Sequence, residues 1–400
     1  MSQKKGGVAR IETLTLRPKE VALAIKHMIH VNIKEIARGR KRRPVFIWGP
    51  PGIGKSDIMN QVASELGYRV IDIRLTQVEP TDLRGIPIPV NIAKDGTTTS
   101  FMSGTSTDSE TLVRWAPPEL LPRDPEEKAI IFLDELPNAP PSVQAGAYQL
   151  VLDGRLGEYV VPKNCVVFAA GNRETDKGGT FKMPTPLTNR FTHVEMRTDF
   201  DDWQIYALYN SFNKDVVGYL TAFKKDLFEF DAMSASRGFP TPRSWEATSA
   251  ILNNSPNLPE QVLLALVSGA VGDGIAVKFM EYRRLANKLP NPSEILDGKM
   301  VKLEEKDISL MYALTTSLCY ELNERYMVVK PVWNKDPEAK KKFSKYFDNF
   351  LGFMMRELQP ELVIMGARTA LAVLHIQFDP SGMKHFKEFS DQYKSKIIDA

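Results

Sequence analysis

The sequence predicts an α/β fold, in which a parallel sheet is sandwiched by helices, followed by an all-helical region. Short apolar runs of strand length alternate with helical stretches as far as Asp199, and this alternation is typical of parallel sheets with helices on both faces. From Asp201 onward the apolar residues recur at helical spacing. A glycine-rich loop follows the first apolar run, Pro44–Trp48, and such a loop marks a functional edge of the sheet.

The glycine-rich loop is GPPGIGKS, which follows the phosphate-loop pattern of Gly, four free residues and Gly-Lys-Ser. Its glycines allow backbone conformations, some with positive φ, that point N–H groups at a phosphate. Lys55 supplies a cation for the β- and γ-phosphates, and the Ser56 hydroxyl can ligate Mg²⁺. We therefore expect ATP and Mg²⁺ as ligands. The predicted nucleotide-binding residues are Gly49, Pro50, Pro51, Gly52, Ile53, Gly54, Lys55 and Ser56.

Composition indicates a globular protein in a reducing compartment. Hydrophobic residues make up 43% of the 400 residues, and the formal charge is only +3, too small for a whole-protein field that favours nucleic acid or a membrane. The two cysteines and five scattered histidines exclude a disulfide framework and a zinc cluster of ordinary spacing. Because no apolar run of about 18 residues and no signal core is present, we expect a cytoplasmic protein without membrane insertion.

The next elements are a helix over Ser56–Leu66 and a buried strand over Tyr68–Leu75. An insertion then begins at Thr81 and is rich in Gly, Pro, Thr and Ser as far as Gly104. So long an irregular stretch is usually functional, as a loop or hairpin that faces a substrate. A passive surface excursion is the alternative.

The basic run at Arg38, Arg40, Lys41, Arg42 and Arg43 leaves two interpretations open. It could contact nucleic acid, or it could be a solvated loop. No aromatic residues interleave the run, and stacking aromatics usually accompany single-strand binding. A solvated loop is the favoured interpretation.

A third apolar strand, Ala129–Leu133, ends in two carboxylates, Asp134 and Glu135. This is the Walker B pattern, and parallel strands deliver their C-terminal residues to one edge of the sheet. Asp134 is predicted to hold the Mg²⁺ shell and Glu135 to polarise the attacking water, although the two could instead cap the following helix. The strand Cys165–Ala170 leads to Asn172, whose amide could orient that water or simply form a turn.

Helices are predicted for Val21–Ile36 and Pro141–Leu152, with a hairpin over residues 154–162. After Asp201 a helical domain is followed by a linker over Pro290–Met300 and a third, helical segment. The predicted helices there are Trp203–Phe212, Val216–Phe228, Ser244–Leu252, Gln261–Val271, Ile275–Leu285, Ile308–Arg325, Lys342–Arg356 and Glu361–Ile376.

Together these motifs resemble the AAA+ ATPases and, within them, the MoxR family. The runs ELPNAPPSVQAGAYQLVLDGRL and FAAGNRETDKGGTFKMPTPLTNRF are similar to the MoxR pattern of an Asp-Glu box, a helix, a hairpin, an Asn sensor and a terminal Arg-Phe. The resemblance covers about residues 40 to 250, and the later helices look like those of an extended subgroup. It implies a tail over 1–16, an AAA+ domain over 17–199 with an insertion at 81–114, a helical lid over 200–289 and a helical extension over 290–400.

The resemblance also assigns roles in catalysis. It makes Asn172 the first sensor, Arg190 the arginine finger that reaches a neighbouring subunit's nucleotide, and Arg243 the second sensor. The turn before Arg190 lacks the acidic residue that is common in the family, so Arg197 and Arg173 remain lesser candidates. The insertion at 81–114 matches the family's helix-two insert, and residues 157–161 match its pre-sensor hairpin.

A remodelling chaperone is the leading function that this resemblance implies. Such an ATPase would work as a homo-oligomeric, hexameric ring on a protein partner, such as one with a von Willebrand factor A domain. An arginine supplied by a neighbour raises the rate of phosphoryl transfer by about 10³ to 10⁵, so activity implies assembly. The alternatives are a nucleic-acid motor, which salt-dependent DNA binding would reveal, and an assembly protein gated by nucleotide.

Overall fold

The computed structural model describes residues 14–93, 98–100, 109–173, 176, 181, 183–230, 237–255, 257–286, 288–303 and 307–398. The chain divides into two compact units, Met1–Asp199 and Phe200–Ala400. The finer boundaries expected after residues 16 and 289 stay predictions. No helix in the described part of the chain is long and apolar enough to cross a membrane.

The first unit is built on a six-stranded sheet in which every neighbouring pair is parallel. All the C-terminal ends of its strands therefore lie along one edge. The four strands expected from the sequence are present, and the α/β prediction is confirmed. In spatial order the strands are β1 (Thr15–Leu16), β11 (Thr192–Met196), β2 (Val45–Trp48), β10 (Cys165–Gly171), β7 (Ala129–Asp134) and β3 (Arg69–Arg74).

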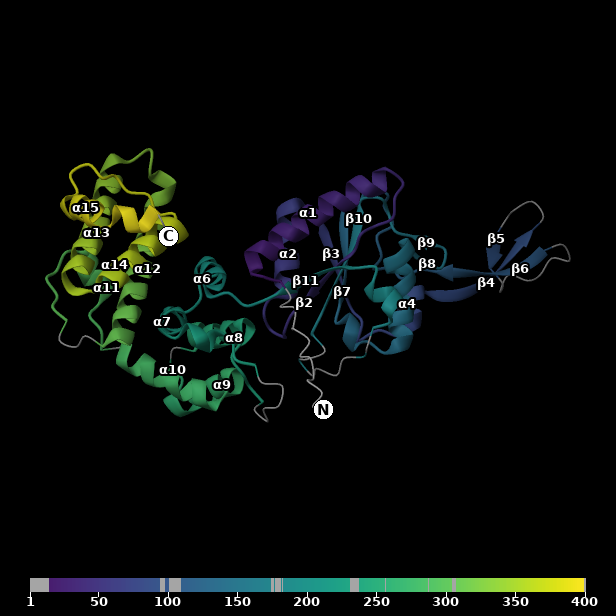
Figure 1. Ribbon diagram of the computed structural model, residues 1–400, viewed down its shortest axis with the longest axis horizontal. Coiled ribbons are helices and arrows are strands. Elements are labelled where there is room, and N and C mark those ends of the chain that lie inside the picture. The colour runs from purple at the N-terminus through teal and green to yellow at the C-terminus, as the bar shows by residue number, and fades with distance from the viewer. Residues whose placement is uncertain are drawn as a thin grey trace, which may run out of the picture. The chain divides into compact units, whose positions relative to one another are not determined.

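Helices cover both faces of this sheet (Figure 1). Helices α1 (Pro18–Ala37) and α2 (Lys55–Leu66) lie on one side, and α4 (Pro141–Asp153) lies on the other. Successive strand residues point to opposite faces, and β10 is buried along its whole length. Burial on both faces explains why these strands are continuously apolar rather than alternating.

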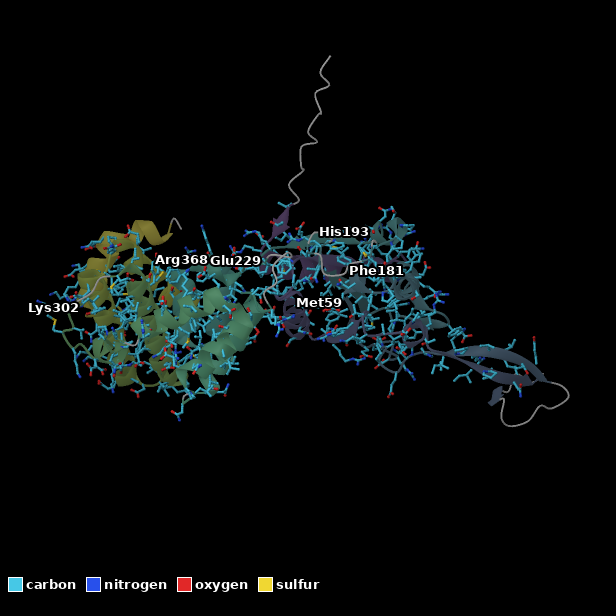
Figure 2. All side chains as sticks on the ribbon, turned by 90° about the horizontal axis from the view of Figure 1, so that it is seen from below. Met59, Phe181, His193, Glu229, Lys302 and Arg368 are labelled. Carbon is cyan, nitrogen blue, oxygen red and sulfur yellow. The ribbon has the colours of Figure 1, made fainter. Side chains whose placement is uncertain are left out.

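The insertion is more regular than the sequence suggested. A short helix, α3 (Pro80–Arg84), leads into a three-stranded antiparallel sheet, which we call the ribbon. It consists of β4 (Ile86–Ala93), β5 (Thr98–Ser100) and β6 (Ser109–Ala116) in the order β5-β4-β6. The ribbon extends away from the six-stranded sheet in Figures 1 and 2. Alternating residues such as Ile86, Ile88 and Val90 give it strand periodicity, which the Pro content of the stretch obscured.

The predicted hairpin is present as β8 (Arg155–Leu156) and β9 (Tyr159–Val160), which pair antiparallel. Arg42 anchors its end: the guanidinium donates to the carbonyls of Val161 and Pro162 at 2.8 Å each and to that of Cys165 at 3.3 Å. Burial lowers the pKa of Arg42 from its ordinary value. A Cβ at Gly154, which has φ +62°, would lie 2.1 Å from Arg42 Nη1, so this position requires glycine.

Three further cations of the basic run form exposed ion pairs. Arg38 and Arg40 pair with Glu35 at 3.2 and 3.1 Å, and Lys41 pairs with Asp153 at 3.0 Å. The run therefore serves contacts inside the first unit. Arg42 in particular holds three backbone carbonyls in place. Its side chain is therefore not the solvated loop residue that the sequence favoured.

The second unit is helical. In its amino-terminal half a core of buried side chains includes Trp203, Tyr219, Trp245 and Phe279. The helices of this half are α6 (Phe200–Tyr209), α7 (Lys214–Ala222), a 3-10 turn (Lys224–Leu227), α8 (Pro242–Asn254), α9 (Glu260–Val271) and α10 (Asp273–Ala286). The helix expected over Val216–Phe228 thus ends at Ala222, because Phe223 leaves the helical conformation.

A separate core in the carboxyl-terminal half contains Phe343, Phe347, Phe350 and Met354, which confirms that these aromatic positions are core. The expected linker is partly helical, with Ile295 and Leu296 buried. The last helix was not predicted. The helices of this half are α11 (Pro292–Leu296), α12 (Ile308–Val329), α13 (Pro337–Glu357), α14 (Pro360–Arg368), which runs into a π-helical turn (Thr369–Val373), and α15 (Lys384–Ile398).

Candidate nucleotide site

The glycine-rich loop joins β2 to the amino end of α2, where helix N–H groups and the helix dipole favour an anion. Gly52 and Gly54 have φ of +75° and +91°, a conformation that other residues adopt only with strain. Gly49 is required for a different reason. A Cβ there would lie 2.9 Å from the carbonyl oxygen of Met196, at the end of β11.

The Lys55 ammonium group lies inside this loop. Its Nζ donates to the carbonyls of Gly49 and Pro50 at 2.8 and 2.9 Å and to Asn172 Oδ1 at 3.1 Å. The loop and the end of β10 thus meet at one cation. This contact places the predicted sensor Asn172 beside the predicted phosphate-binding lysine.

The end of β7 faces the beginning of α2. The Ser56 hydroxyl donates to Asp134 Oδ2 at 2.9 Å, and the backbone N–H of Glu135 donates to Asp134 Oδ1 at 2.9 Å. A hydroxyl and a carboxylate oxygen are hard ligands of the kind that Mg²⁺ prefers. The donor set present therefore fits the predicted metal.

Glu135 leaves the strand in a left-handed conformation, with φ 58° and ψ 29°. Its Oε2 accepts a 2.6 Å hydrogen bond from the Thr76 hydroxyl, just beyond the end of β3. Left-handed backbone in a residue with a Cβ is uncommon and occurs often at functional sites. Here it turns the chain into a 3-10 turn, Leu136–Asn138, and so keeps Glu135 at the edge of the sheet and not in the following helix.

Asn172 follows β10, whose last residue is held tightly. A Cβ at Gly171 would lie 2.3 Å from Pro137 Cδ, and the Gly171 carbonyl accepts from the Gly49 N–H at 3.3 Å. The strand end therefore packs against both the turn after Glu135 and the start of the phosphate loop. Asn172 is half-buried.

Carboxylates concentrate negative charge at the β3–β7 side of this edge. The pKa of Asp72 is raised from its ordinary value, chiefly by burial and then by the nearby carboxylates of Asp134 and Glu135, while Arg74 opposes the shift. Such a field attracts a cation. This agrees with the fit of Ser56 and Asp134 to a metal.

Arg190 lies outside this cluster. It is exposed, in the turn between α5 (Thr185–Thr188) and β11, and its neighbours Leu187 and Phe191 are buried. Glu195 and Asp199, the carboxylates that could bind it, pair instead with Arg173 at 3.0 Å and Arg197 at 3.5 Å. Within the described residues neither of them pairs with Arg190.

The two lesser candidates for the arginine finger, Arg173 and Arg197, form ion pairs within the first unit. Arg173 contacts both carboxylate oxygens of Asp176 at 3.1 to 3.2 Å in addition to Glu195. The Arg197 guanidinium pairs with Asp199 at 3.5 Å. Arg243 belongs to the second unit, where it is exposed in the first turn of α8. Its role as a second sensor stays a prediction.

Sequence reasoning missed two residues that contact this site. Thr76 directly follows the predicted strand Tyr68–Leu75, so the rule that pointed to Asn172, a polar residue after a buried strand, would have found it. His193, which contacts Trp48, carries no such signal, because β11 was not predicted from its sequence THVEM.

A family model matches the part of the chain that contains this site. Residues 44–191 match the family model described as an AAA domain of the dynein-related subfamily. Midasin from Giardia intestinalis is 28% identical over 199 residues, which are 47% of this chain and 4% of midasin. The replication factor C large subunit from Pyrobaculum calidifontis is 38% identical over 39 residues, 10% of this chain and 9% of that protein. The chain thus spans only a small part of both relatives.

Among solved structures, the RuvB Holliday junction branch migration motor of Thermotoga maritima covers 74% of this chain and 81% of its own, with 17% identity and a TM-score of 0.31. NtrX from Brucella abortus in complex with ATP covers 96% of this chain and 69% of its own, with 13% identity and a TM-score of 0.32. Residues 44–191, which include the phosphate loop and strands β2, β3, β7 and β10, thus match an AAA domain of the dynein-related subfamily.

Proposed function

We propose that this protein is a MoxR-like AAA+ ATPase that binds and hydrolyses ATP in a ring and uses the cycle to remodel a protein partner. The observation that carries the proposal is the convergence of Lys55, Ser56, Asp134, Glu135 and Asn172 at one edge of the parallel sheet. Each side chain there matches one need of phosphoanhydride hydrolysis.

Nucleotide binding rests on the loop and its lysine. The triphosphate would take over the Lys55 ammonium group from its present carbonyl partners, Gly49 and Pro50, and lie against the amino end of α2. Ser56 and Asp134 would hold Mg²⁺, which when bound neutralises phosphate charge. The loop itself would exclude water from the phosphates.

Hydrolysis would use Glu135 as the general base. Its carboxylate would accept a proton from the attacking water, and Asn172, which is already beside Lys55, would orient that water toward the γ-phosphate. Release of the Thr76 hydrogen bond would free the Glu135 carboxylate to accept that proton.

Arg190 would complete the site of a neighbouring subunit. The turn is fixed by the buried Leu187 and Phe191 while the guanidinium is exposed, as a side chain offered to another subunit should be. Arg243, at the start of α8, would act from the second unit as the second sensor. Because Arg190 would serve a neighbour, a closed ring, hexameric by resemblance, is the proposed active state.

The exposed apolar side chains of the ribbon are an argument for a protein partner. Ile86, Ile88 and Leu112 lie on one face of it and are 65%, 45% and 42% exposed. Apolar side chains gathered on a surface mark contacts with other proteins. A partner with a von Willebrand factor A domain fits the resemblance.

The nucleic-acid alternative is weakened by the internal partners of Arg38, Arg40, Lys41 and Arg42.

Mixed rings test this proposal. Arg190→Ala should keep nucleotide affinity and lose most ATPase activity, and Lys55→Ala should lose nucleotide binding. Combining the two inactive variants should restore part of the activity, since an intact loop can then lie beside an intact arginine. Rings shown to contain both subunits but without recovery would exclude Arg190 as a finger acting in trans.

Glu135→Gln serves as the companion variant. It should bind ATP, hydrolyse it very slowly and remain in the ATP-bound ring, because the amide keeps the shape of the carboxylate but cannot accept the proton. Hydrolysis at the wild-type rate would assign the base to another residue.

Added DNA should leave wild-type turnover unchanged, and a salt-dependent stimulation by DNA would favour the nucleic-acid motor instead.

A further inference from the structure

One imidazole joins the beginning of the phosphate loop to the turn that carries Arg190. The indole Nε1–H of Trp48 donates to His193 Nδ1 at 2.8 Å, and His193 Nε2 lies 2.8 Å from the carbonyl oxygen of Thr188. His193 is exposed, on β11 in the first unit (Figure 2). No role in nucleotide chemistry has so far been given to it.

The two contacts define the protonation state of the ring. The Thr188 carbonyl can only accept, so Nε2 must carry the hydrogen, and Nδ1 must be the bare nitrogen that accepts from Trp48. The neutral Nε2–H tautomer satisfies both bonds at once. The imidazole thus links the two groups by accepting a hydrogen bond from Trp48 and donating one to the Thr188 carbonyl.

The Trp48 end of this connection adjoins the phosphate loop, at the last residue of β2. Trp48 directly precedes Gly49, and its ring stacks on Phe46 with the centroids 4.1 Å apart. The imidazole stacks on the indole at 5.9 Å. Because β11 also touches Gly49 through the Met196 carbonyl, the same strand contacts the start of the loop at two points.

The Thr188 end is part of the arginine turn. The Thr188 carbonyl also accepts the Phe191 N–H at 3.2 Å and thereby closes the turn that contains Arg190. The Arg190 N–H donates to the Leu187 carbonyl at 3.1 Å in the same turn. His193 therefore contacts a carbonyl that helps to close the turn around Arg190.

We propose that His193 is a positioning residue that couples a subunit's own phosphate loop to the arginine it offers to its neighbour. A displacement of Trp48 by nucleotide would pass through the imidazole to the Thr188 carbonyl and the Arg190 turn. The inference rests on the proposed function of Arg190 in trans. It adds a path by which the nucleotide state of one subunit affects hydrolysis in the next.

The first test uses His193→Phe, which keeps an aromatic ring beside Trp48 and removes both hydrogen bonds. We expect the kcat for ATP to fall about threefold to tenfold, as for loss of one or two neutral hydrogen bonds, with unchanged nucleotide affinity and an unchanged melting temperature. His30→Phe, an exposed histidine on α1, is the matched control and should keep the wild-type kcat. An unchanged kcat in His193→Phe would overturn the proposal.

Trp48→Phe tests the connection itself, because it removes the indole N–H that donates to His193 and keeps a smaller aromatic ring. Added to His193→Phe it should lower the kcat no further, since the bond is already lost. Independent, multiplicative losses would mean that the two residues act separately, contrary to the proposal.

Mixed rings then show whether His193 acts on its own subunit's phosphate loop or on the arginine offered to the neighbouring subunit. His193→Phe subunits should gain part of their activity when mixed with Lys55→Ala subunits, in which His193 and Arg190 are both intact, and gain none with Arg190→Ala subunits. The reverse pattern, with recovery only beside Arg190→Ala, would place the defect in the phosphate loop and overturn the proposal. The Arg190→Ala and Lys55→Ala mixture, run in parallel, reports on the trans finger alone, so its failure is distinguishable from that of His193.

Discussion

The Thr76 hydroxyl donates a 2.6 Å hydrogen bond to Glu135 Oε2, across the ends of the adjacent strands β3 and β7. Glu135 is the carboxylate that we propose as the base for hydrolysis. A hydrogen bond to a charged acceptor contributes about 1.5–3 kcal/mol, and here it stabilises the carboxylate in the form that has not yet taken a proton. Thr76 is therefore placed to restrain the base.

Replacing Thr76 by Val tests this restraint, because the valine keeps the shape and lacks the hydroxyl. We expect basal ATPase activity to rise a few-fold, roughly as expected for partial loss of a charge-assisted hydrogen bond, with unchanged affinity for ATP. Thr76→Ser is the matched control and should behave like the wild type. A fall in turnover would show that the hydroxyl orients Glu135 for catalysis instead.

Nucleotide binding should depend on Lys55. Lys55→Ala removes the cation that meets Gly49, Pro50 and Asn172, and the triphosphate charge then lacks its main compensation. Binding of a fluorescent ATP analogue should be abolished. Lys26→Ala, which removes a surface pair with Glu65 on α2, is a lysine control in the same unit and should bind normally. Unchanged affinity in Lys55→Ala would refute the phosphate-loop assignment.

The ribbon should serve a partner and not the nucleotide. Pro87 and Trp115 are cross-strand partners, so a short Gly-Asn turn between them removes the outer part of the ribbon. Basal ATPase should stay within a few-fold of the wild type, while stimulation by the co-purified partner should be lost. If basal hydrolysis collapsed in an intact ring, the segment would belong to the catalytic core.

Single substitutions can then identify the face of the ribbon that is used. Ile88 and Leu112 lie on one face, and Val113 lies on the other although it is 56% exposed. Ile88→Lys should weaken the partner's stimulation, and Val113→Lys is the matched control on the opposite face. Equal effects of the two changes would argue against a contact through the face of Ile88.

Arg42 should matter for stability. Arg42→Met leaves the carbonyls of Val161, Pro162 and Cys165 without their donor, which should lower the free energy of unfolding of the first unit by about 1–3 kcal/mol. Lys41→Met breaks only the exposed pair with Asp153 and should cost roughly 0–1 kcal/mol. Thermal unfolding measures both. Equal losses would mean that Arg42 is a solvated loop residue after all.

The nucleotide site was the most predictable part of the chain, because its chemistry is local. Gly52, Gly54 and Lys55 are adjacent in the loop, and a parallel sheet brings Asp134 and Asn172 to the same edge by topology alone. The contact of Lys55 with Asn172 follows from that rule. Their catalytic roles stay predictions.

The remaining features depend on long-range packing that no local pattern encodes. β11 is short, and its first residues, Thr192 and His193, are exposed, so its pairing with the neighbouring strands β1 and β2 makes it a strand. The ribbon was expected to be irregular, because proline at 87 and 89 is unfavourable inside a sheet. Arg42 appeared to be one cation in a solvated run, since the carbonyls it binds lie more than a hundred residues away in the sequence.

Helix α12 determines which parts of the second unit can fold without each other. Ala313, on this helix, belongs to the core around Trp245, whereas Leu314 and Leu318 belong to the core around Phe347. Gly218 in α7 closely approaches Ala313, and the Tyr320 hydroxyl donates to the Phe212 carbonyl at 3.3 Å. A chain cut after residue 289 would therefore lose one wall of the core that includes Tyr219 and Trp245. We therefore expect the carboxyl-terminal helices and the preceding ones to unfold together, in one transition.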